Sequence, residues 1–190
     1  AVERLKARVP LGATNMEAAM MAAATSFSGE TKPRACVYIG DGMSAANILG
    51  TEKFAKLVSA LVESRVAVSS FAVGPRLDEQ LLGSLAGRTG GVMRSQSGMA
   101  VVEKDGKPAG VAAVSPDEVG KSLAEVATGV VFWPVAVELP QKRITEMLPK
   151  ALPPLRADRD SVVIGTIEGN EPLSIKVRAN TPAGLKEMAW

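Results

Sequence analysis

The run Ala35-Cys-Val-Tyr-Ile-Gly40, followed directly by Asp41-Gly42, decides the fold class of this sequence. It is short, apolar on both faces and bounded by turn-forming residues, which predicts a buried strand of a parallel sheet. A second run of the same kind, Val66-Ala-Val-Ser-Ser-Phe-Ala-Val73, ends at Gly74-Pro75. The stretch between the two runs predicts an amphipathic helix, because apolar side chains recur there at helical spacing: Phe54, Leu57, Val58, Leu61 and Val62.

Helical and strand patterns continue to alternate on both sides of this stretch. Helices are expected over residues 2–9, 15–27 and 77–85, and a short strand over residues 92–94. A further helix is expected to begin after Ser115, with Glu118 completing a capping box, and to end near Thr128. This alternation predicts right-handed crossovers and a parallel sheet covered by helices.

The pattern changes at Gly129, after which no helical period of any length remains. Residues 130–139, 161–167 and 173–177 are typical of strands, and the turn-forming residues 168–171 predict a hairpin between the last two. We therefore expect an α/β domain over residues 1–128 and a small, sandwich-like β segment over residues 129–190. A β segment of about 60 residues is marginal as an independent domain.

The composition excludes several classes of function. Histidine is absent and Cys36 is the single cysteine, which excludes imidazole-dependent nucleophiles, zinc sites rich in His or Cys, and intramolecular disulfides. The net charge of +2 argues against a nucleic-acid surface. No apolar run approaches the ~20 residues of a membrane span. A metal ion would have to be held by oxygen atoms, which favours magnesium, manganese or calcium.

Thr14 and Asp41 are the two candidate ligands for such an ion, and each has a structural alternative. Thr14 precedes a helix, where it could cap the first turn in a capping box with Glu17, or offer its hydroxyl to a hard cation. Asp41 follows an apolar strand, where it could serve a strand-ending turn or present a carboxylate. Ligands of open α/β sheets collect beyond the carboxyl ends of the strands, which is where Asp41 is expected.

The order of these motifs resembles a known family. The chain contains Gly12-Ala-Thr-Asn15, a helix, a strand ending in Ile39-Gly-Asp-Gly42, an amphipathic helix, a second strand, a Leu-rich helix and Thr89-Gly-Gly91. Over residues 2–128 this order resembles the second half of a von Willebrand factor A (vWA) domain, so the expected fold is a partial, Rossmann-like α/β sheet with flanking helices.

The resemblance implies a metal-ion-dependent adhesion site (MIDAS). Thr14 would be its threonine ligand, and Asp41 the later aspartate that acts directly or through water. The family's Asp-x-Ser-x-Ser motif lies on a strand before that threonine and does not occur in these 190 residues. The resemblance therefore implies a site completed by residues upstream of this chain. By themselves, these residues are expected to bind Mg²⁺, Mn²⁺ or Ca²⁺ weakly.

The tail carries a second resemblance, in Trp133-Pro-Val-Ala-Val-Glu-Leu139, in the Pro-rich residues 147–155 and in residues 160–167. These segments resemble the β segment that follows the vWA domain in bacterial proteins related to inter-alpha-trypsin inhibitor heavy chains, which begin with a vault-type (VIT) domain. A generic pair of β-hairpins is the alternative. Bacterial relatives of this architecture are commonly exported, which favours the cell envelope or secretion, although a single cysteine fits either compartment.

Together these features predict a non-enzymatic binding module whose protein partner supplies an acidic group to the metal ion. A structural or assembly domain of a cell-envelope protein, with a degenerate metal site, is the alternative. An A-domain subunit of an ATP-driven assembly is a third class, against which the β tail argues. In the vWA arrangement another strand lies beside residues 35–40, so the edge there is expected to pair with an upstream segment of the same protein or with a second copy.

Overall fold

The structure is a computed structural model of the chain. It describes residues 2–9, 12–27, 32–95, 103–104, 107–108, 115–139 and 143–190.

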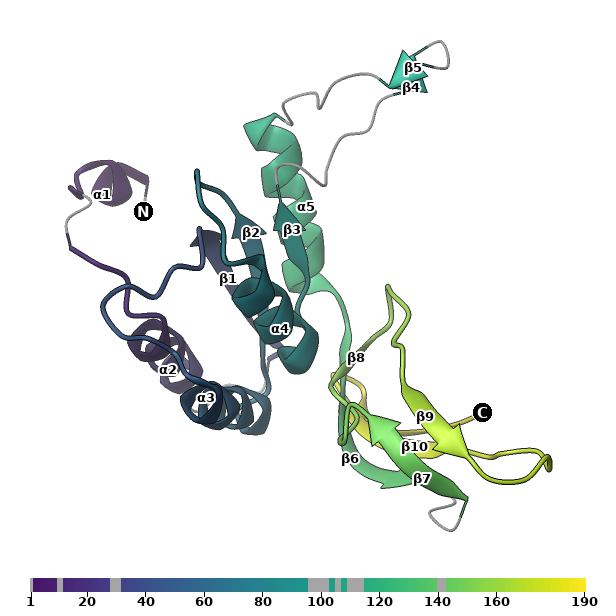
Figure 1. Cartoon of the computed structure of the whole chain (residues 1–190). Coiled ribbons are helices and arrows are strands. Elements are labelled where there is room, and N and C mark those ends of the chain that lie inside the picture. Colours follow the sequence, from purple (N-terminus) through teal and green to yellow (C-terminus); the bar gives the residue numbers. More distant parts are fainter. Residues whose placement is uncertain are drawn as a thin grey trace.

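A parallel sheet forms the centre of the first half of the molecule, as the sequence predicts (Figure 1). Strand β1 (Arg34–Gly40) pairs in parallel with β2 (Val66–Ala72), and β2 pairs in parallel with the short strand β3 (Met93–Ser95). The order in the sheet is therefore β1-β2-β3, with β2 fully buried. All three carboxyl ends point to the same edge, which we call the carboxyl edge.

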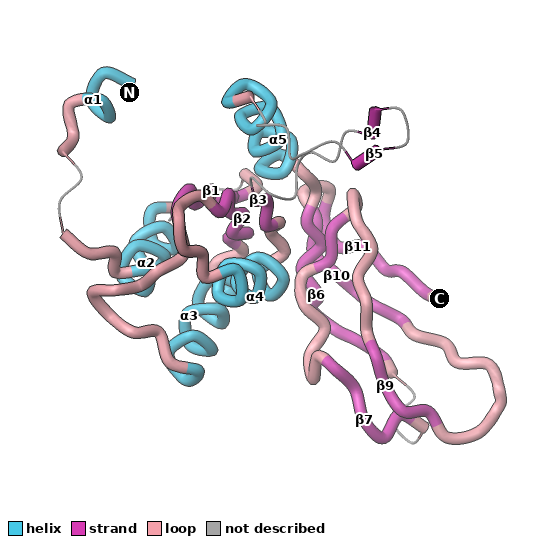
Figure 2. Tube along the Cα trace, turned by 45° about the horizontal axis from the view of Figure 1, so that its top comes forward, coloured by secondary structure: helices cyan, strands magenta, loops and turns pink. Residues whose placement is uncertain are grey.

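Helices cover both faces of this sheet (Figure 2). Helices α2 (Met16–Ser26), α3 (Thr51–Glu63) and α4 (Glu79–Thr89) lie on one face, and α5 (Pro116–Thr128) packs on the other, against β1 and β2. The short helix α1 (Val2–Lys6) precedes them. The core lies mainly under the first group of helices, where apolar side chains from α2, α3, α4 and β2 are fully buried: Met16, Leu57, Leu61, Val66, Val68, Leu82 and Leu85.

Strand β1 is an edge of this sheet within the described ranges. Two of its apolar side chains are left open to solvent: Val37 is 39% exposed and Ile39 is 62% exposed. Both belong to the face opposite Cys36 and Tyr38, which pack against the core. Burial raises the pKa of the Cys36 thiol, consistent with the role of a small apolar side chain.

The beginning of α2 differs from the prediction that Thr14 caps it. Asn15 is the capping residue, and its side-chain oxygen accepts a hydrogen bond from the Ala18 amide at 3.0 Å. The capping box of Thr14 with Glu17 is therefore wrong, because the helix begins one residue later than that box requires. At α5 the expected capping box does form, between Ser115 and Glu118. The hydrogen bond from the Ser115 amide lowers the pKa of the Glu118 carboxyl.

The residues after α5 form strands. β6 (Val131–Glu138), β8 (Leu155–Arg156), β10 (Lys176–Thr181) and β11 (Gly184–Ala189) make an antiparallel sheet in the order β11-β10-β6-β8. A separate antiparallel pair contains β7 (Ile144–Leu148) and β9 (Ile164–Ile167). An apolar cavity of about 620 Å³ is lined by residues of both sheets. The small strands β4 (Glu103–Lys104) and β5 (Lys107–Pro108) pair with each other in antiparallel orientation.

The predicted hairpin between residues 161–167 and 173–177 is wrong. β9 pairs with β7 instead, and β10 pairs with β6 and β11. The loop between β9 and β10 wraps around Arg143, whose guanidinium donates hydrogen bonds to three carbonyls, those of Glu168, Glu171 and Pro172, at 2.8–3.2 Å. This loop therefore holds the two strands apart, although its Gly169 is in the turn-forming conformation with φ 82°.

Arg156 joins the two parts of the molecule. Its side chain is only 1% exposed, and its guanidinium donates hydrogen bonds to the Gly90 carbonyl after α4 and the Val126 carbonyl in α5. The same guanidinium pairs with Asp158 at 2.6 Å. A Cβ atom on residue 129 would overlap this guanidinium. This explains why a glycine stands there, although its backbone conformation (φ −60°) is one that any residue can adopt.

Candidate functional site

Asp41 lies where the sequence predicts it, directly after the last residue of β1. Its Oδ1 atom accepts a hydrogen bond from the Met43 amide at 2.9 Å, so the aspartate also serves the turn that was the alternative interpretation. Gly42 permits this turn, because its φ of +79° suits glycine and a Cβ atom would lie 2.9 Å from Leu82 Cγ. The Asp41 carbonyl accepts from the Asp78 amide at 2.8 Å, which ties the turn to the start of α4.

Thr14 lies immediately before the capping residue of α2. Its carbonyl accepts a hydrogen bond from the Ala46 amide at 3.0 Å. Because Asn15 caps the helix, the Thr14 hydroxyl is not needed for that purpose, and it has no hydrogen-bond partner among the described residues. The residue is exposed, so the hydroxyl is accessible to a ligand.

The loop of residues 41–50 is held against the start of α2 by further hydrogen bonds. Ser44 Oγ accepts from the Met16 amide at 3.2 Å and donates to the Asn47 carbonyl at 2.6 Å. The Asn47 side chain donates to Glu17 Oε2 at 2.6 Å, and Lys53 lies 3.9 Å from the same carboxylate. The loop that begins at Asp41 and the segment that contains Thr14 are therefore neighbours at the carboxyl edge.

Ser44 and Asn47 are residues whose role sequence reasoning missed. Their partners, Met16 and Glu17, lie 28 and 30 residues away in the sequence, so no local pattern could connect them. The one available signal was the polar character of Ser44 and Asn47 directly after a strand end. Glu17, which was expected to face Thr14, is instead the anchor for this loop.

The acidic groups present at the carboxyl edge supply only part of a metal site. Among the described residues, no group of three or more Asp, Glu, Cys or His side chains is placed to hold a metal ion. One free oxygen of Asp41 and the hydroxyl of Thr14 are the oxygen donors of the predicted pair. Hard cations accept such donors, but these two do not fill the six positions that Mg²⁺ or Mn²⁺ commonly takes.

A parallel sheet with helices on both faces, with polar residues gathered beyond its carboxyl ends, defines a class of open α/β domains that bind ligands at that edge. Within this class, the sequence model of the von Willebrand factor type A domain family matches residues 1–95 of the 190. The chain therefore belongs to this family. Domains of the family often mediate protein interactions.

A solved structure of similar fold is a von Willebrand factor type A protein from Catenulispora acidiphila, with a TM-score of 0.57 and 10% sequence identity. The match covers 98% of this chain and 48% of that chain, so the present chain spans about half the length of the solved protein. At this identity the likeness concerns the fold alone. The search of curated proteins gave no match.

No helix in the described ranges combines the length and hydropathy that crossing a bilayer requires.

Proposed function

We propose that this chain is a non-enzymatic protein-binding module whose interaction depends on a divalent cation at the carboxyl edge of the sheet. Thr14 contributes a hydroxyl and Asp41 a carboxylate to the ion, and residues upstream of this chain complete its coordination. When bound, the ion supplies a positive charge to which an acidic group of the partner protein binds. Mg²⁺, Mn²⁺ and Ca²⁺ all suit an oxygen-only donor set.

The observation that carries this proposal is the attachment of the 41–50 loop to the start of α2. The hydrogen bond from Ala46 to the Thr14 carbonyl and that from Met16 to Ser44 keep the two segments together. Asn15 does the capping, which leaves the Thr14 hydroxyl available. An ion that used both donors would therefore break no hydrogen bond that stabilises the described fold.

Further proposals follow from the second half of the chain. The strands from Val131 onward support the assignment to a bacterial protein of the VIT–vWA type, related to inter-alpha-trypsin inhibitor heavy chains, with an adhesion role at the cell envelope. A structural or assembly domain with a degenerate metal site is the second candidate function. It is favoured because the described residues contain no group of three or more Asp, Glu, Cys or His side chains that could hold a metal ion.

Calorimetric titration with Mn²⁺ tests the proposal. The 190-residue chain should bind one ion with a dissociation constant weaker than about 100 μM, because its site is incomplete. Asp41→Ala should abolish this binding and Thr14→Val should weaken it. Asp117→Ala, on the exposed surface of α5, and Asn15→Ala, which removes only the cap, should bind as the wild type does.

Two results would contradict the proposal. Unchanged binding by Asp41→Ala would place the ion elsewhere and favour the structural alternative. Micromolar binding that Asp41→Ala abolishes would show that the chain carries a complete site and needs no upstream residues.

A further inference from the structure

A second cavity lies at the opposite end of the parallel sheet from Asp41. It has a volume of about 730 Å³ and is lined by the first residues of β1 and β2, the end of α5, the start of β6 and the turn after β10. We call it the amino-edge cleft. Seven residues of β1 separate the two edges, which corresponds to about 20 Å at 3.3 Å per residue. The cleft is therefore distinct from the proposed metal site.

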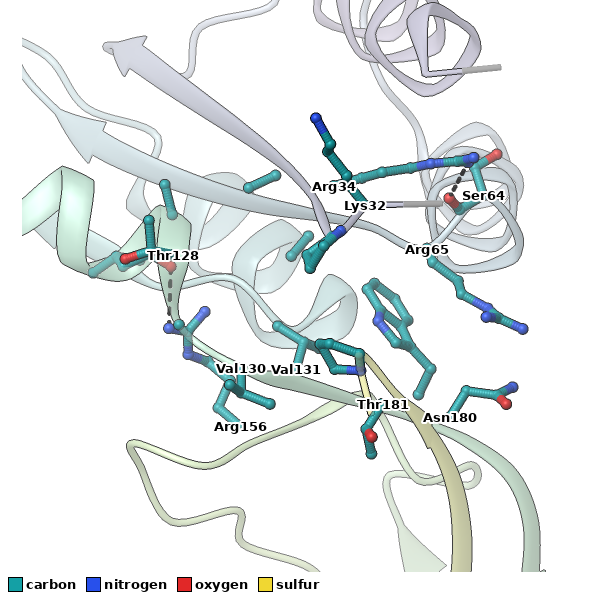
Figure 3. Close-up of a pocket in the computed structure, with 18 of the residues that line it drawn as sticks. Lys32, Arg34, Ser64, Arg65, Thr128, Val130, Val131, Arg156, Asn180 and Thr181 are labelled. Carbon is teal, nitrogen blue, oxygen red and sulfur yellow. Dashed lines mark hydrogen bonds between the residues drawn. The ribbon is translucent and has the colours of Figure 1, made fainter. Parts of the chain in front are cut away.

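Four cations and one carboxylate line this cleft, namely Lys32, Arg34, Arg65, Arg156 and Glu63. Two of the arginines are committed to the fold. Arg34 donates to the Ser64 carbonyl at the end of α3 at 2.9 Å, as the dashed line in Figure 3 marks. Arg156 donates to Val126 in α5 and pairs with Asp158. These contacts neutralise the carbonyl ends of both helices, which would otherwise repel an anion.

The other two cations, Lys32 and Arg65, are exposed and have no ion pair with any described residue. Figure 3 shows them with Arg34 on the side formed by the α/β half, across from Asn180 and Thr181 of the strand half. Arg156 is paired with Asp158, and the carboxylate of Glu63 offsets one of the three remaining cations, so about two positive charges are in surplus at the cleft. These charges favour an anionic ligand by long-range attraction.

Part of the lining of the cleft is apolar, and we call this part the floor. Its lining includes Pro33, Ala35, Ala67, Val131, Trp133 and Pro182. Trp133 adds a large ring with one hydrogen-bond donor, the kind of side chain that anchors partners at protein interfaces. An apolar floor with a cationic rim suits a ligand that has both apolar groups and carboxylates.

We propose that the amino-edge cleft binds an acidic peptide segment of a partner protein, with apolar side chains on the floor and carboxylates at Lys32 and Arg65. We choose an acidic peptide as the ligand because its carboxylates complement the positive charges of Lys32 and Arg65. A nucleic-acid strand would need a longer track of cations than these two residues provide. Inorganic phosphate would leave the apolar floor unfilled. Because both halves of the chain form the walls, the bound segment also stabilises their arrangement.

Fluorescence anisotropy with labelled short peptides tests this proposal, in the presence of EDTA so that the metal site plays no part. A peptide alternating leucine and glutamate should bind at least about fivefold more tightly than peptides alternating serine and glutamate or leucine and lysine. Trp190→Phe leaves Trp133 as the single tryptophan, so its fluorescence should change when the first peptide binds.

The variant that removes the free cations is Lys32→Ser combined with Arg65→Gly. Arg65 has a left-handed backbone (φ 52°), which glycine adopts at least as readily, so the fold should be preserved. This variant should lose affinity for the leucine–glutamate peptide by about fivefold. Lys121→Ser with Lys186→Ser removes the same charge from exposed positions outside the cleft and should bind as the wild type does.

Equal binding of the three peptides, or equal losses in the cleft and control variants, would overturn the proposal. Tighter binding of a labelled oligothymidine than of the leucine–glutamate peptide would overturn the assignment to a peptide partner. Since EDTA is present throughout, none of these results depends on the metal-dependent function proposed above.

Discussion

Ser70 is a buried hydroxyl in the middle of β2. It is 1% exposed, and its Oγ atom has no hydrogen-bond partner among the described residues. Its neighbour Ser69 is equally buried, but Ser69 Oγ accepts a hydrogen bond from the Val92 amide at 3.1 Å and so helps to hold the segment before β3. The two serines form a natural pair of test and control positions.

Ser70→Ala should leave the free energy of unfolding unchanged or raise it by about 1 kcal/mol, because it removes an unsatisfied buried hydroxyl. Ser69→Ala should lower it by about 1 kcal/mol, because the Val92 amide loses its acceptor. Denaturation in urea measures both values. A clear destabilisation by Ser70→Ala would show that its hydroxyl has a partner in solution.

For single residues, the sequence predicted the position relative to strands and helices better than the hydrogen bonds that each side chain makes. Asp41 and Thr14 are where the order of motifs placed them, yet the cap of α2 is Asn15 and not Thr14. Asn and Thr can both cap a helix, so predicting which of them does so requires the start of the helix to within one residue. Helix propensity does not locate the start that accurately. Arg156 was missed because its partners, Gly90 and Val126, are 66 and 30 residues away.

At the scale of elements, the parallel strands and amphipathic helices were predicted well because burial enforces their patterns. β2 and α3 are the clearest cases: every residue of β2 is buried, and α3 carries a stripe of apolar side chains at helical spacing. The later strands are partly or fully exposed at most positions, so their sequence patterns are weaker and their pairing is set by long-range contacts. The Arg143 side chain shows this, since it holds residues 168–172 in a loop where the sequence predicted a hairpin.

The exposed edge of β1 leads to a prediction about association. Unpaired backbone groups beside the exposed Val37 and Ile39 should favour pairing with another strand, from an upstream segment or a second copy. The 190-residue chain alone should therefore self-associate at tens of micromolar, as measured by light scattering. Ile39→Lys should reduce this association, because a charged side chain on an edge strand opposes pairing.

Ile48→Lys is the matched control, since Ile48 is at least as exposed as Ile39 but lies in the 41–50 loop. It should associate as the wild type does. A chain that stays monomeric at these concentrations and melts cooperatively would contradict the prediction and show that β1 is a stable edge.

At the scale of the whole molecule, the Arg156–Asp158 pair links the helical and strand halves. Asp158 is about half exposed, and the hydrogen bond from Arg156 lowers the pKa of its carboxyl below the ordinary 3.8. A lowered pKa in the folded state means that the stabilisation is present above about pH 4 and is lost as the pH falls through the folded-state pKa.

Asp158→Asn should therefore lower Tm most at neutral pH, and the difference from the wild type should shrink below about pH 4. Melting curves between pH 2.5 and pH 7 measure it, with Asp160→Asn as a nearby exposed control that should follow the wild type. A Tm difference that stays constant over this range would show that the pair contributes nothing through the charge of Asp158.

A paramagnetic ion can test directly whether one divalent cation binds at the carboxyl edge between Thr14 and Asp41. Mn²⁺ broadens the amide signals of nearby residues in NMR spectra, so a titration locates the ion even when binding is weak. The amide signals of Thr14 and residues 41–44 should broaden first, while those of Arg34 and Arg65, about 20 Å away at the opposite edge, should be unaffected. Early broadening around Asp158, or an unaffected Thr14, would contradict it.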